Sequence, residues 1–561
     1  MSDYKFATMP SVSIARSKFV RSQPHGTSFN LGELVVLGFD EVIPGSTHKI
    51  DIGSLIRMST PIAPIMDDIQ CDIFSFFVPM RLTWQHWKQF MGESDQAGIA
   101  NVTYTIPQIN KFQGSKINTV ADDLGLVGEE VVNNVNGTDI SVLPFRAFAL
   151  IYNRWFRNQN VEAPIPVSTA DTVTYGELQY LAPGVKTMMF NPNQPDTFGT
   201  TRYKAYKLPD YFTSALPYAQ KGQPVQIFGD NALAPVVAGD NHATSGKIMN
   251  WSNKDGTAFT GNFLIGAAND STSRVIKGNL DNSDNYYTSM DYSVPSNLWA
   301  NLNAAVNTTI NDLRFAFQLQ KALEKDALYG SRYWEVLRAH YAVTSPDASL
   351  QDPQILGQIK FDINISQVLQ TTGFTSPSST NLGTPGANSV TASRGHLFTA
   401  SFVEHGYIFH VLVARQKHHT YSQGMNKTWL RKERFDFYHP VFANLGAQKV
   451  LNKEIYFNGG TTGDQVFGYQ EAWAEYRFLP GYNSGLLNPS RNSSLDYWNL
   501  ADNYGATPTL GPTFLKEDRS NLARCLVTGV NGPDFIGNFY IKDTVVNPMP
   551  LYSIPGFADH H

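Results

Sequence analysis

The stretch Asp68–Val78 reads DIQCDIFSFFV and gives the strongest strand signal in the chain. Apolar and polar residues alternate through its first half, as they do along a strand that turns one face toward a core. Toward Val78 both faces become apolar, which is typical of a strand buried between two layers. The stretch therefore predicts a β-rich protein whose central sheet is covered on both sides.

Further strands are predicted on either side of this stretch. Leu34–Ile43 (LVVLGFDEVI) ends at a Pro-Gly turn, and Tyr407–Arg415 (YIFHVLVAR) follows a hairpin-like break at Glu404. The pattern also predicts strands at His48–Met58, Leu397–Val403, Arg434–Tyr438, Ala472–Phe478, Ala523–Thr528 and Ile536–Ile541. Many strands with scattered helices favour a β-sandwich that carries large insertions.

Helices are predicted in four places. Thr83–Met91 and Phe145–Arg157 carry aromatic stripes, which are more often core than a binding site. The longest pattern precedes Gly330, a plausible helix stop, and a shorter helix is predicted at Arg332–Tyr341. In the longest pattern the apolar residues recur at spacings of three and four: Leu302, Val306, Ile310, Leu313 and Phe317.

Composition narrows the class of protein. Of 561 residues 42% are apolar, enough for a sizeable core, and only 16% are charged, against about 25% in typical domains. Low charge with many aromatic residues favours a chain that covers its surface with partners, although a large β protein with uncharged loops has the same composition. Two cysteines do not make a disulfide scaffold, and neither a signal peptide nor a membrane span is expected.

The net charge of −5 argues against neutralisation of nucleic acid over the whole surface. Residues 1–30 are an exception, and we interpret them as an N-terminal arm in which cations stand beside phenylalanines. Such pairs suit single-stranded nucleic acid, although a short basic arm is often only a solvated terminus. The candidate nucleic-acid-binding residues are Lys5, Arg16, Lys18 and Arg21. A second basic run, between Lys417 and Arg434, is explained equally well by contacts between subunits.

Residues 222–295 differ from the rest of the chain. From Asp240 to Ser289, 29 of 50 residues are Gly, Ser, Thr, Asn or Asp. Isolated aromatic residues interrupt this polar stretch: Trp251, Phe259, Tyr286 and Tyr287. Pure linkers lack such residues, so the segment is predicted to hold a small β structure, and an insertion of this length is usually either functional or disordered.

The common catalytic motifs are absent from the sequence. His405 and His410 diverge on a regular strand, so a metal site built from the local histidines is disfavoured. Glu471 and Glu475 could suggest glycoside hydrolysis, but packing is the more common role of aromatic-rich strands. A calcium site at Asp67-Asp68 is less well supported than a solvated turn. We therefore predict no catalytic residue, no bound metal and no cofactor.

Several blocks of the sequence resemble one family. They are DEVIPG at Asp40–Gly45, Pro61–Glu93, LPFRAFALIYNRWFRNQN at Leu143–Asn160, Ile310–Asp347, Glu471–Gly485 and PMPLYSIPG at Pro548–Gly556. In this order they resemble the major capsid protein of the Microviridae, and specifically of the gokushovirus group of single-stranded DNA phages. The differences lie mostly between the blocks.

The resemblance implies an eight-stranded antiparallel jelly-roll β-sandwich with long loop and helical insertions. The expected layout is an arm (1–30) and a capsid domain (31–561), with a surface protrusion (222–295) and a helical insertion (308–341). The implied function is a non-enzymatic subunit of an icosahedral shell around circular single-stranded DNA.

The same resemblance implies a set of partners: other copies of the chain, the genome, a small basic DNA-packaging protein, a pilot protein and a host receptor bound by the protrusion. The expected location is the virion capsid, assembled in the host cytoplasm. The alternative is a secreted β-sandwich that binds or hydrolyses polysaccharide, which the absence of a signal peptide disfavours.

Overall fold

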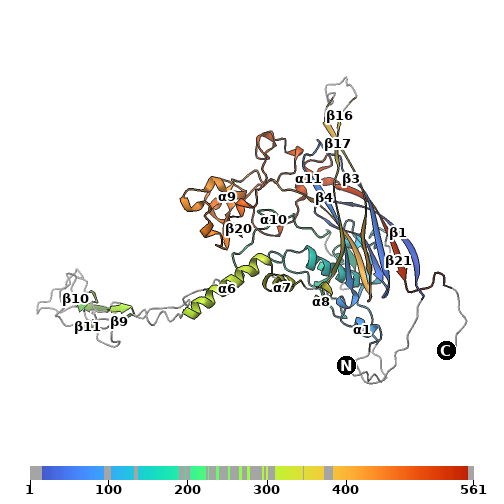
Figure 1. The fold of residues 1–561 in the computed structure, drawn as a ribbon, viewed down its shortest axis with the longest axis horizontal. Helices are drawn as coiled ribbons and strands as arrows, with labels where there is room; N and C mark the ends of the chain where they lie inside the picture. The colour runs from blue at the N-terminus through green and yellow to red at the C-terminus, as the bar shows by residue number, and fades with distance from the viewer. Residues whose placement is uncertain are drawn as a thin grey trace. The chain divides into compact units, whose positions relative to one another are not determined.

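A computed structural model gives the fold of the chain (Figure 1). It describes residues 15–93, 103–131, 137–188, 196–197, 202–222, 225, 236–238, 251–252, 264–267, 274–277, 294–295, 298–300, 310–330, 332–344, 346–369, 371, 383 and 385–553. Within these ranges, none of the helices combines the length and the apolar character that a membrane span needs.

The chain divides into two compact units. The first comprises Met1–Ala219 and Asp326–His561, and the second is Gln220–Lys325. The predicted insertion 222–295 falls within the second unit, where short strands form antiparallel pairs: β10 (Trp251–Ser252) with β13 (Val294–Pro295), β11 (Leu264–Ala267) with β12 (Arg274–Lys277), and β14 (Leu298–Ala300) with β9 (Val236–Ala238). Phe259, Tyr286 and Tyr287 lie outside the described residues.

Two antiparallel sheets dominate the first unit. The five-stranded sheet has the order β1 (Ser17–Phe29), β21 (Phe535–Asn547), β3 (Thr47–Met58), β17 (Pro385–Ser401), β16 (Ile365–Leu369). The four-stranded sheet has the order β15 (Gln354–Asp362), β4 (Ile69–Pro79), β18 (Gly406–Gln416), β2 (Leu34–Val42). The protein is therefore mainly β, as the sequence predicts, and its arrangement is that of a β-sandwich.

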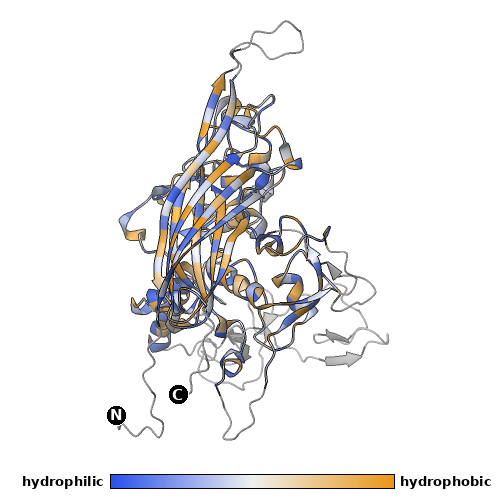
Figure 2. Ribbon diagram, turned by 90° about the vertical axis from the view of Figure 1, so that its right-hand side faces the viewer, coloured by the Kyte–Doolittle hydropathy of each residue, from blue (hydrophilic) through white to orange (hydrophobic). Residues whose placement is uncertain are grey.

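The four-stranded sheet is covered on both faces. Cys71 and Ile73 of β4 belong to a core shared with the five-stranded sheet. Phe76 and Val78 face a second core, built with helix α3 (Leu143–Ile151) and its neighbours. The prediction that both faces of this strand are buried is confirmed. The five-stranded sheet contributes one face to the shared core, and along its strands hydrophilic and hydrophobic residues alternate (Figure 2).

The longest described helix is α6 (Ile310–Tyr329), which ends before Gly330 as predicted. The predicted helix after Gly330 is α7 (Tyr333–Tyr341). The others are α1 (Trp87–Phe90), α2 (Val120–Asp123), α3, α4 (Tyr175–Leu181), α8 (Asp347–Leu350), α9 (Asn452–Ile455), α10 (Pro512–Leu515) and α11 (Arg519–Ala523). A π-helical turn (Tyr152–Phe156) extends α3 over the region predicted to be helical. A small sheet has the order β6 (Thr138–Ser141), β5 (Gln108–Ser115), β7 (Val185–Thr187), β8 (Asp196–Thr197).

Residues 417–523 form a loop-rich lobe with its own core, in which β19 (Ala447–Leu451) pairs with β20 (Val466–Glu471). Three strand predictions in and beside this lobe are wrong. Arg434–Asp436 and Ala474–Tyr476 are 3₁₀ turns. The predicted strand Ala523–Thr528 begins at the last residue of helix α11 and continues as turns, with one isolated bridge between Leu526 and Pro61. The aromatic residues that suggested strands at the first two positions lie on the surface of the lobe, where no alternating core contact exists to align them.

The N-terminal segment also differs from the sequence prediction. Residues 17–29 of the predicted arm are strand β1, which pairs with β21 from Ser17↔Asn547 to Phe29↔Phe535. Most of its side chains are exposed because β1 is the edge strand of the sheet. An edge strand with little apolar alternation has the same composition as a solvated arm, which explains the error.

Candidate nucleic-acid interface

The exposed face of the five-stranded sheet is built by strand periodicity. Along β21 the side chains of Phe535 and Phe539 point into the core, whereas Ile536, Asn538 and Tyr540 point to solvent. Residues that are an even number apart share a face of the sheet. Among paired antiparallel strands, directly opposite residues share that face as well.

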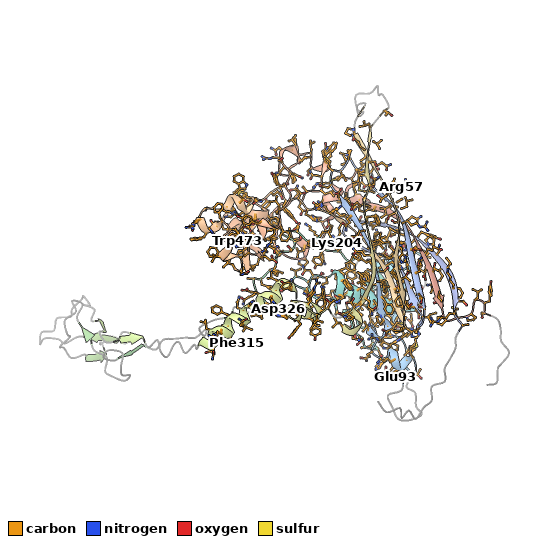
Figure 3. All side chains as sticks on the ribbon, in the orientation of Figure 1. Arg57, Glu93, Lys204, Phe315, Asp326 and Trp473 are labelled. Carbon is orange, nitrogen blue, oxygen red and sulfur yellow. The ribbon has the colours of Figure 1, made fainter. Side chains whose placement is uncertain are left out.

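This register brings five cations from four strands onto the exposed face. Lys49 and Arg57 lie on β3 (Arg57 is labelled in Figure 3). Gly53, between them, is paired with Arg394 of β17, and Asp51 is paired with Lys542 of β21. The fifth cation is Lys18 of β1, whose partner is Val546.

None of the five cations is within 4.0 Å of a carboxylate in the part of the chain that the structure describes. The one carboxylate on this face of the five strands is Asp51, whose Oδ1 lies 2.9 Å from Nδ1 of His396. Five cations less Asp51 give the face a net charge of +4, with histidine counted as neutral, on a chain whose total is −5. A strand rises about 3.3 Å per residue, so the cations extend over about 33 Å from Arg57 to the row of Lys18.

An aromatic ring stands among these cations. Tyr540 is 49% exposed and is paired with Gly53 of β3 on one side and with Pro24 of β1 on the other. Its hydroxyl donates a hydrogen bond to Ser22 Oγ at 2.8 Å, which holds the ring over the sheet. Cations that meet phosphates, together with a flat ring that meets bases, are what a single-stranded nucleic-acid surface requires.

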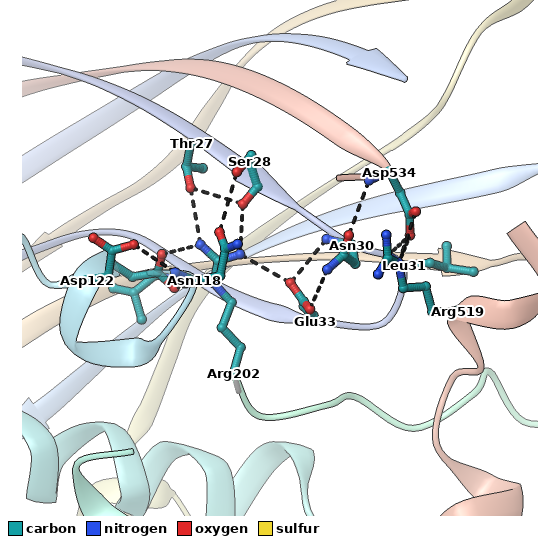
Figure 4. Close-up of polar contacts among 12 residues, drawn as sticks. Thr27, Ser28, Asn30, Leu31, Glu33, Asn118, Asp122, Arg202, Arg519 and Asp534 are labelled. Carbon is teal, nitrogen blue, oxygen red and sulfur yellow. Dashed lines mark hydrogen bonds and ion pairs between the residues drawn. The ribbon is translucent and has the colours of Figure 1, made fainter. Parts of the chain in front are cut away.

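Two arginines, the buried Arg202 and the exposed Arg21, hold β1 in place. The Arg202 guanidinium donates to the Ser28 carbonyl at 2.8 Å and to Thr27 Oγ1 at 3.2 Å, and it pairs with Glu33 and Asp123 (Figure 4). Its side chain is completely buried. At the other end of the strand, Arg21 forms ion pairs with Asp40 and Asp543. Because each arginine ties β1 to neighbouring elements, the edge of the interface is rigid.

The Arg21 site could otherwise suggest a metal centre. Asp40, His48 and Asp543 each place one ligand atom within 4.8 Å of the others, beside a cavity of about 230 Å³. Arg21 already supplies the positive charge there. Burial opposes ionisation of Asp543, but hydrogen bonds from His48 and Arg21 lower the pKa of this carboxyl. The cluster is therefore a structural ion network between the two sheets.

The four nucleic-acid-binding candidates predicted from the sequence lie in different environments. Lys5 lies outside the described residues, and Arg16 and Lys18 are exposed. Arg21 is engaged with two carboxylates and is not free to meet a phosphate. The residues that the sequence did not reveal are Lys49, Arg57, Arg394 and Lys542, which only the register unites. The even spacing of Lys49 and Arg57 within a predicted strand was the one available signal.

The second basic run is partly neutralised by local contacts. Lys417 lies 3.0 Å from Asp362, and Arg431 lies 3.3 Å from Glu475. Lys427 donates to the Lys449 carbonyl at 3.1 Å. Lys432 and Arg434, the other cations of the run, form no ion pair among the described residues.

The histidine and the glutamates considered as metal ligands or catalytic residues are held in hydrogen bonds and ion pairs. His410 is buried and bonds to Ser75 Oγ through Nδ1 at 2.6 Å, and burial lowers its pKa to about 4. Glu475 pairs with Arg431, and Glu471 pairs with Arg477. Glu471 is the last residue of strand β20, whereas Glu475 lies in the 3₁₀ turn Ala474–Tyr476, so the two do not share one strand face.

Known proteins resemble the chain over nearly its whole length. A profile of the capsid protein (F protein) family matches residues 7–557. Capsid protein VP1 of Bdellovibrio phage phiMH2K is 36% identical, with 98% of this chain and 97% of the relative covered. Capsid protein VP1 of Chlamydia phage 1 is 34% identical over 98% and 97% of the two chains. Capsid protein VP1 of Spiroplasma virus 4 is 35% identical over 95% and 94%.

These relatives are structural proteins of Microviridae, so the alternative of a polysaccharide-binding or polysaccharide-cleaving enzyme is not favoured. The resemblance seen in separate blocks of the sequence extends through the segments between them. The chain belongs to the phage capsid protein (F protein) family and is a structural major capsid protein of the virion.

Proposed function

We propose that this chain is the repeating subunit of an icosahedral shell that encloses circular single-stranded DNA, with the exposed face of the five-stranded sheet turned toward the genome. The two antiparallel sheets support a jelly roll, in which eight of their strands form the sandwich. Assembly takes place in the host cytoplasm, and the virion also holds a small basic DNA-packaging protein and a pilot protein.

The basic sheet face is the observation that carries this proposal. The chain as a whole is acidic, yet one surface carries five cations that form no ion pair with any described residue. A shell subunit needs this segregation because phosphates meet one side only. Five cations per subunit neutralise part of a genome, and the small basic protein supplies the remaining positive charge.

Salt-dependent DNA binding by the unassembled subunit tests the proposal. Each phosphate contact with a single strand contributes about 0.7 to the slope of log K against log salt concentration. Replacing Lys49, Arg57, Arg394 or Lys542 by Gln should lower that slope by about 0.7 per substitution. The matched control is Lys453→Gln, because Lys453 is paired with Asp464 at 2.6 Å. Equal effects of the control and the four variants would contradict the assignment of the DNA-binding face.

A different surface supports contact between subunits. On the lobe, the Arg431 guanidinium lies over the rings of Phe437 and Tyr476, which are both more than half exposed. Trp429 and Leu479, nearby in the chain, are 81% and 82% exposed. Aromatic residues and arginine dominate the centres of protein interfaces. Since Glu475 neutralises Arg431, this surface fits a second copy of the chain better than it fits DNA.

The insertion 222–295 is proposed to attach the particle to its host, as a surface protrusion with Trp251, Phe259, Tyr286 and Tyr287 as candidate contact residues. Polar loops on a rigid scaffold often carry recognition. Deleting residues 240–289 and joining the ends by a short Gly/Ser linker should leave particle formation intact and reduce adsorption to host cells at least tenfold. Adsorption at the wild-type level would refute attachment, and loss of particles would assign the segment a structural role.

A further inference from the structure

A hollow lies at one end of the basic sheet face. It has a volume of about 670 Å³ and opens widely to solvent. Its wall includes Gly26 of β1, Ile536 and Asn538 of β21, and Leu55 and Arg57 of β3. Cross-strand pairing places Gly26 beside Asn538 and Asn538 beside Leu55.

The hollow exists because β1 has a glycine at this position. A Cβ atom added to Gly26 would meet no other atom within 4 Å, so the space above the strand is open. Leu55 and Ile536, 43% and 57% exposed, give the hollow apolar surfaces. Arg57 and Asn538 add a fixed cation, an amide donor and an amide acceptor.

We propose that this hollow receives a nucleobase of the DNA strand that crosses the basic face, an inference that rests on the proposed function. A nucleobase has flat apolar faces and a polar edge, which match Leu55 and Ile536 on the one hand and Arg57 and Asn538 on the other. The strand that carries the base is held by the phosphate contacts of the neighbouring cations. Tyr540, paired with Gly53 in the next row, offers its ring to the adjacent base.

The amide of Asn538 donates and accepts hydrogen bonds, so the hollow accepts more than one kind of base. This tolerance suits a site on a repeated subunit, because each copy of the subunit meets a different part of the genome sequence. The expected contribution is the stacking of a base on the protein, about 1–3 kcal/mol, which corresponds to about 5- to 150-fold in affinity.

Comparing two oligonucleotides with the same phosphates tests the inference. The full-length unassembled subunit should bind a short oligothymidylate at least fivefold more tightly than an abasic strand of equal length. Gly26→Leu should remove this preference and leave both the affinity for the abasic strand and the salt slope unchanged. The matched control is Gly386→Leu, since Gly386 shares the exposed face with Arg394 of β17, lies outside the hollow, and a Cβ there meets only the Val368 carbonyl oxygen, at 3.5 Å. The thermal unfolding midpoint of each variant shows that it is folded. Asn538→Ala, which removes the amide from the hollow, is a second variant for the same comparison.

The outcomes separate the two proposals. Equal binding of both strands by the wild-type subunit would overturn the base site and leave the basic face standing. Binding of neither strand would overturn the proposed function itself. A preference that survives Gly26→Leu would place the base elsewhere and overturn the hollow as its site.

Discussion

His419 is a residue whose charge depends on the fold. It is buried, and its ring nitrogens lie 3.5 Å from Asp502 and 3.5 Å from Glu517. Burial opposes the charged form, but the two carboxylates outweigh it and raise the pKa of His419 to about 9. Lys207 completes the network at 2.9 Å from Asp502. Buried opposite charges thus join three residues of the lobe to Lys207, which lies outside it.

This network predicts a loss of stability at alkaline pH. A raised histidine pKa stabilises the fold fully below the unfolded value of 6.5, and the stabilisation disappears as pH rises through about 9. His419→Gln should therefore lower the free energy of unfolding by about 3 kcal/mol at pH 7. The difference between variant and wild type should shrink by pH 10, as measured by denaturant unfolding at each pH. A difference that stays constant with pH would show that His419 is neutral in the fold.

At the scale of elements, β1 is an edge strand held by side-chain contacts near both of its ends, at Arg21 and at Thr27 and Ser28. Removing residues 1–15 leaves every pair of β1 with β21 intact, whereas removing residues 1–22 deletes six of them and Arg21. Cross-strand pairs contribute about 0.2–1 kcal/mol each, so the longer truncation should cost roughly 3 kcal/mol. Thermal unfolding of the two truncated chains measures this. Equal midpoints would show that β1 contributes nothing to the stability of the sheet.

The same element shows what the sequence could predict. β4 was identifiable because both of its faces are apolar and both are buried. β1 was not, since an edge strand needs only backbone partners, and these lie at the other end of the chain. The segment from Arg434 to Tyr438 was mistaken for a strand because its aromatic residues resemble those of a buried strand. They lie instead on an exposed surface near Arg431. The proposed nucleic-acid interface could not be predicted from the sequence for a related reason: its cations share a face only after four strands are in register.

At the scale of the whole molecule, assembly should depend on the exposed rings of the lobe. Leu479→Glu introduces a charge at a residue that touches little in the single chain, so the subunit should fold normally. If this surface meets another copy, burying that charge should reduce particle yield at least tenfold, as measured by sedimentation. Val403→Glu is the control, because Val403 is 89% exposed outside the lobe. Normal particles from Leu479→Glu would remove the lobe from the contacts between subunits.

The pairing of β1 with β21 also has a consequence for biosynthesis. About 500 residues separate the two strands, so the ribosome makes the partner of β1 long after β1 itself. At 5–20 residues per second, the first strand waits roughly 25 to 100 s before the other has been translated. During that time β3 lacks its neighbour β21, and its edge is open to any other nascent chain. Translation speed and chaperone supply, rather than the stability of the finished sheet, should therefore set the yield of usable subunits in an infected cell.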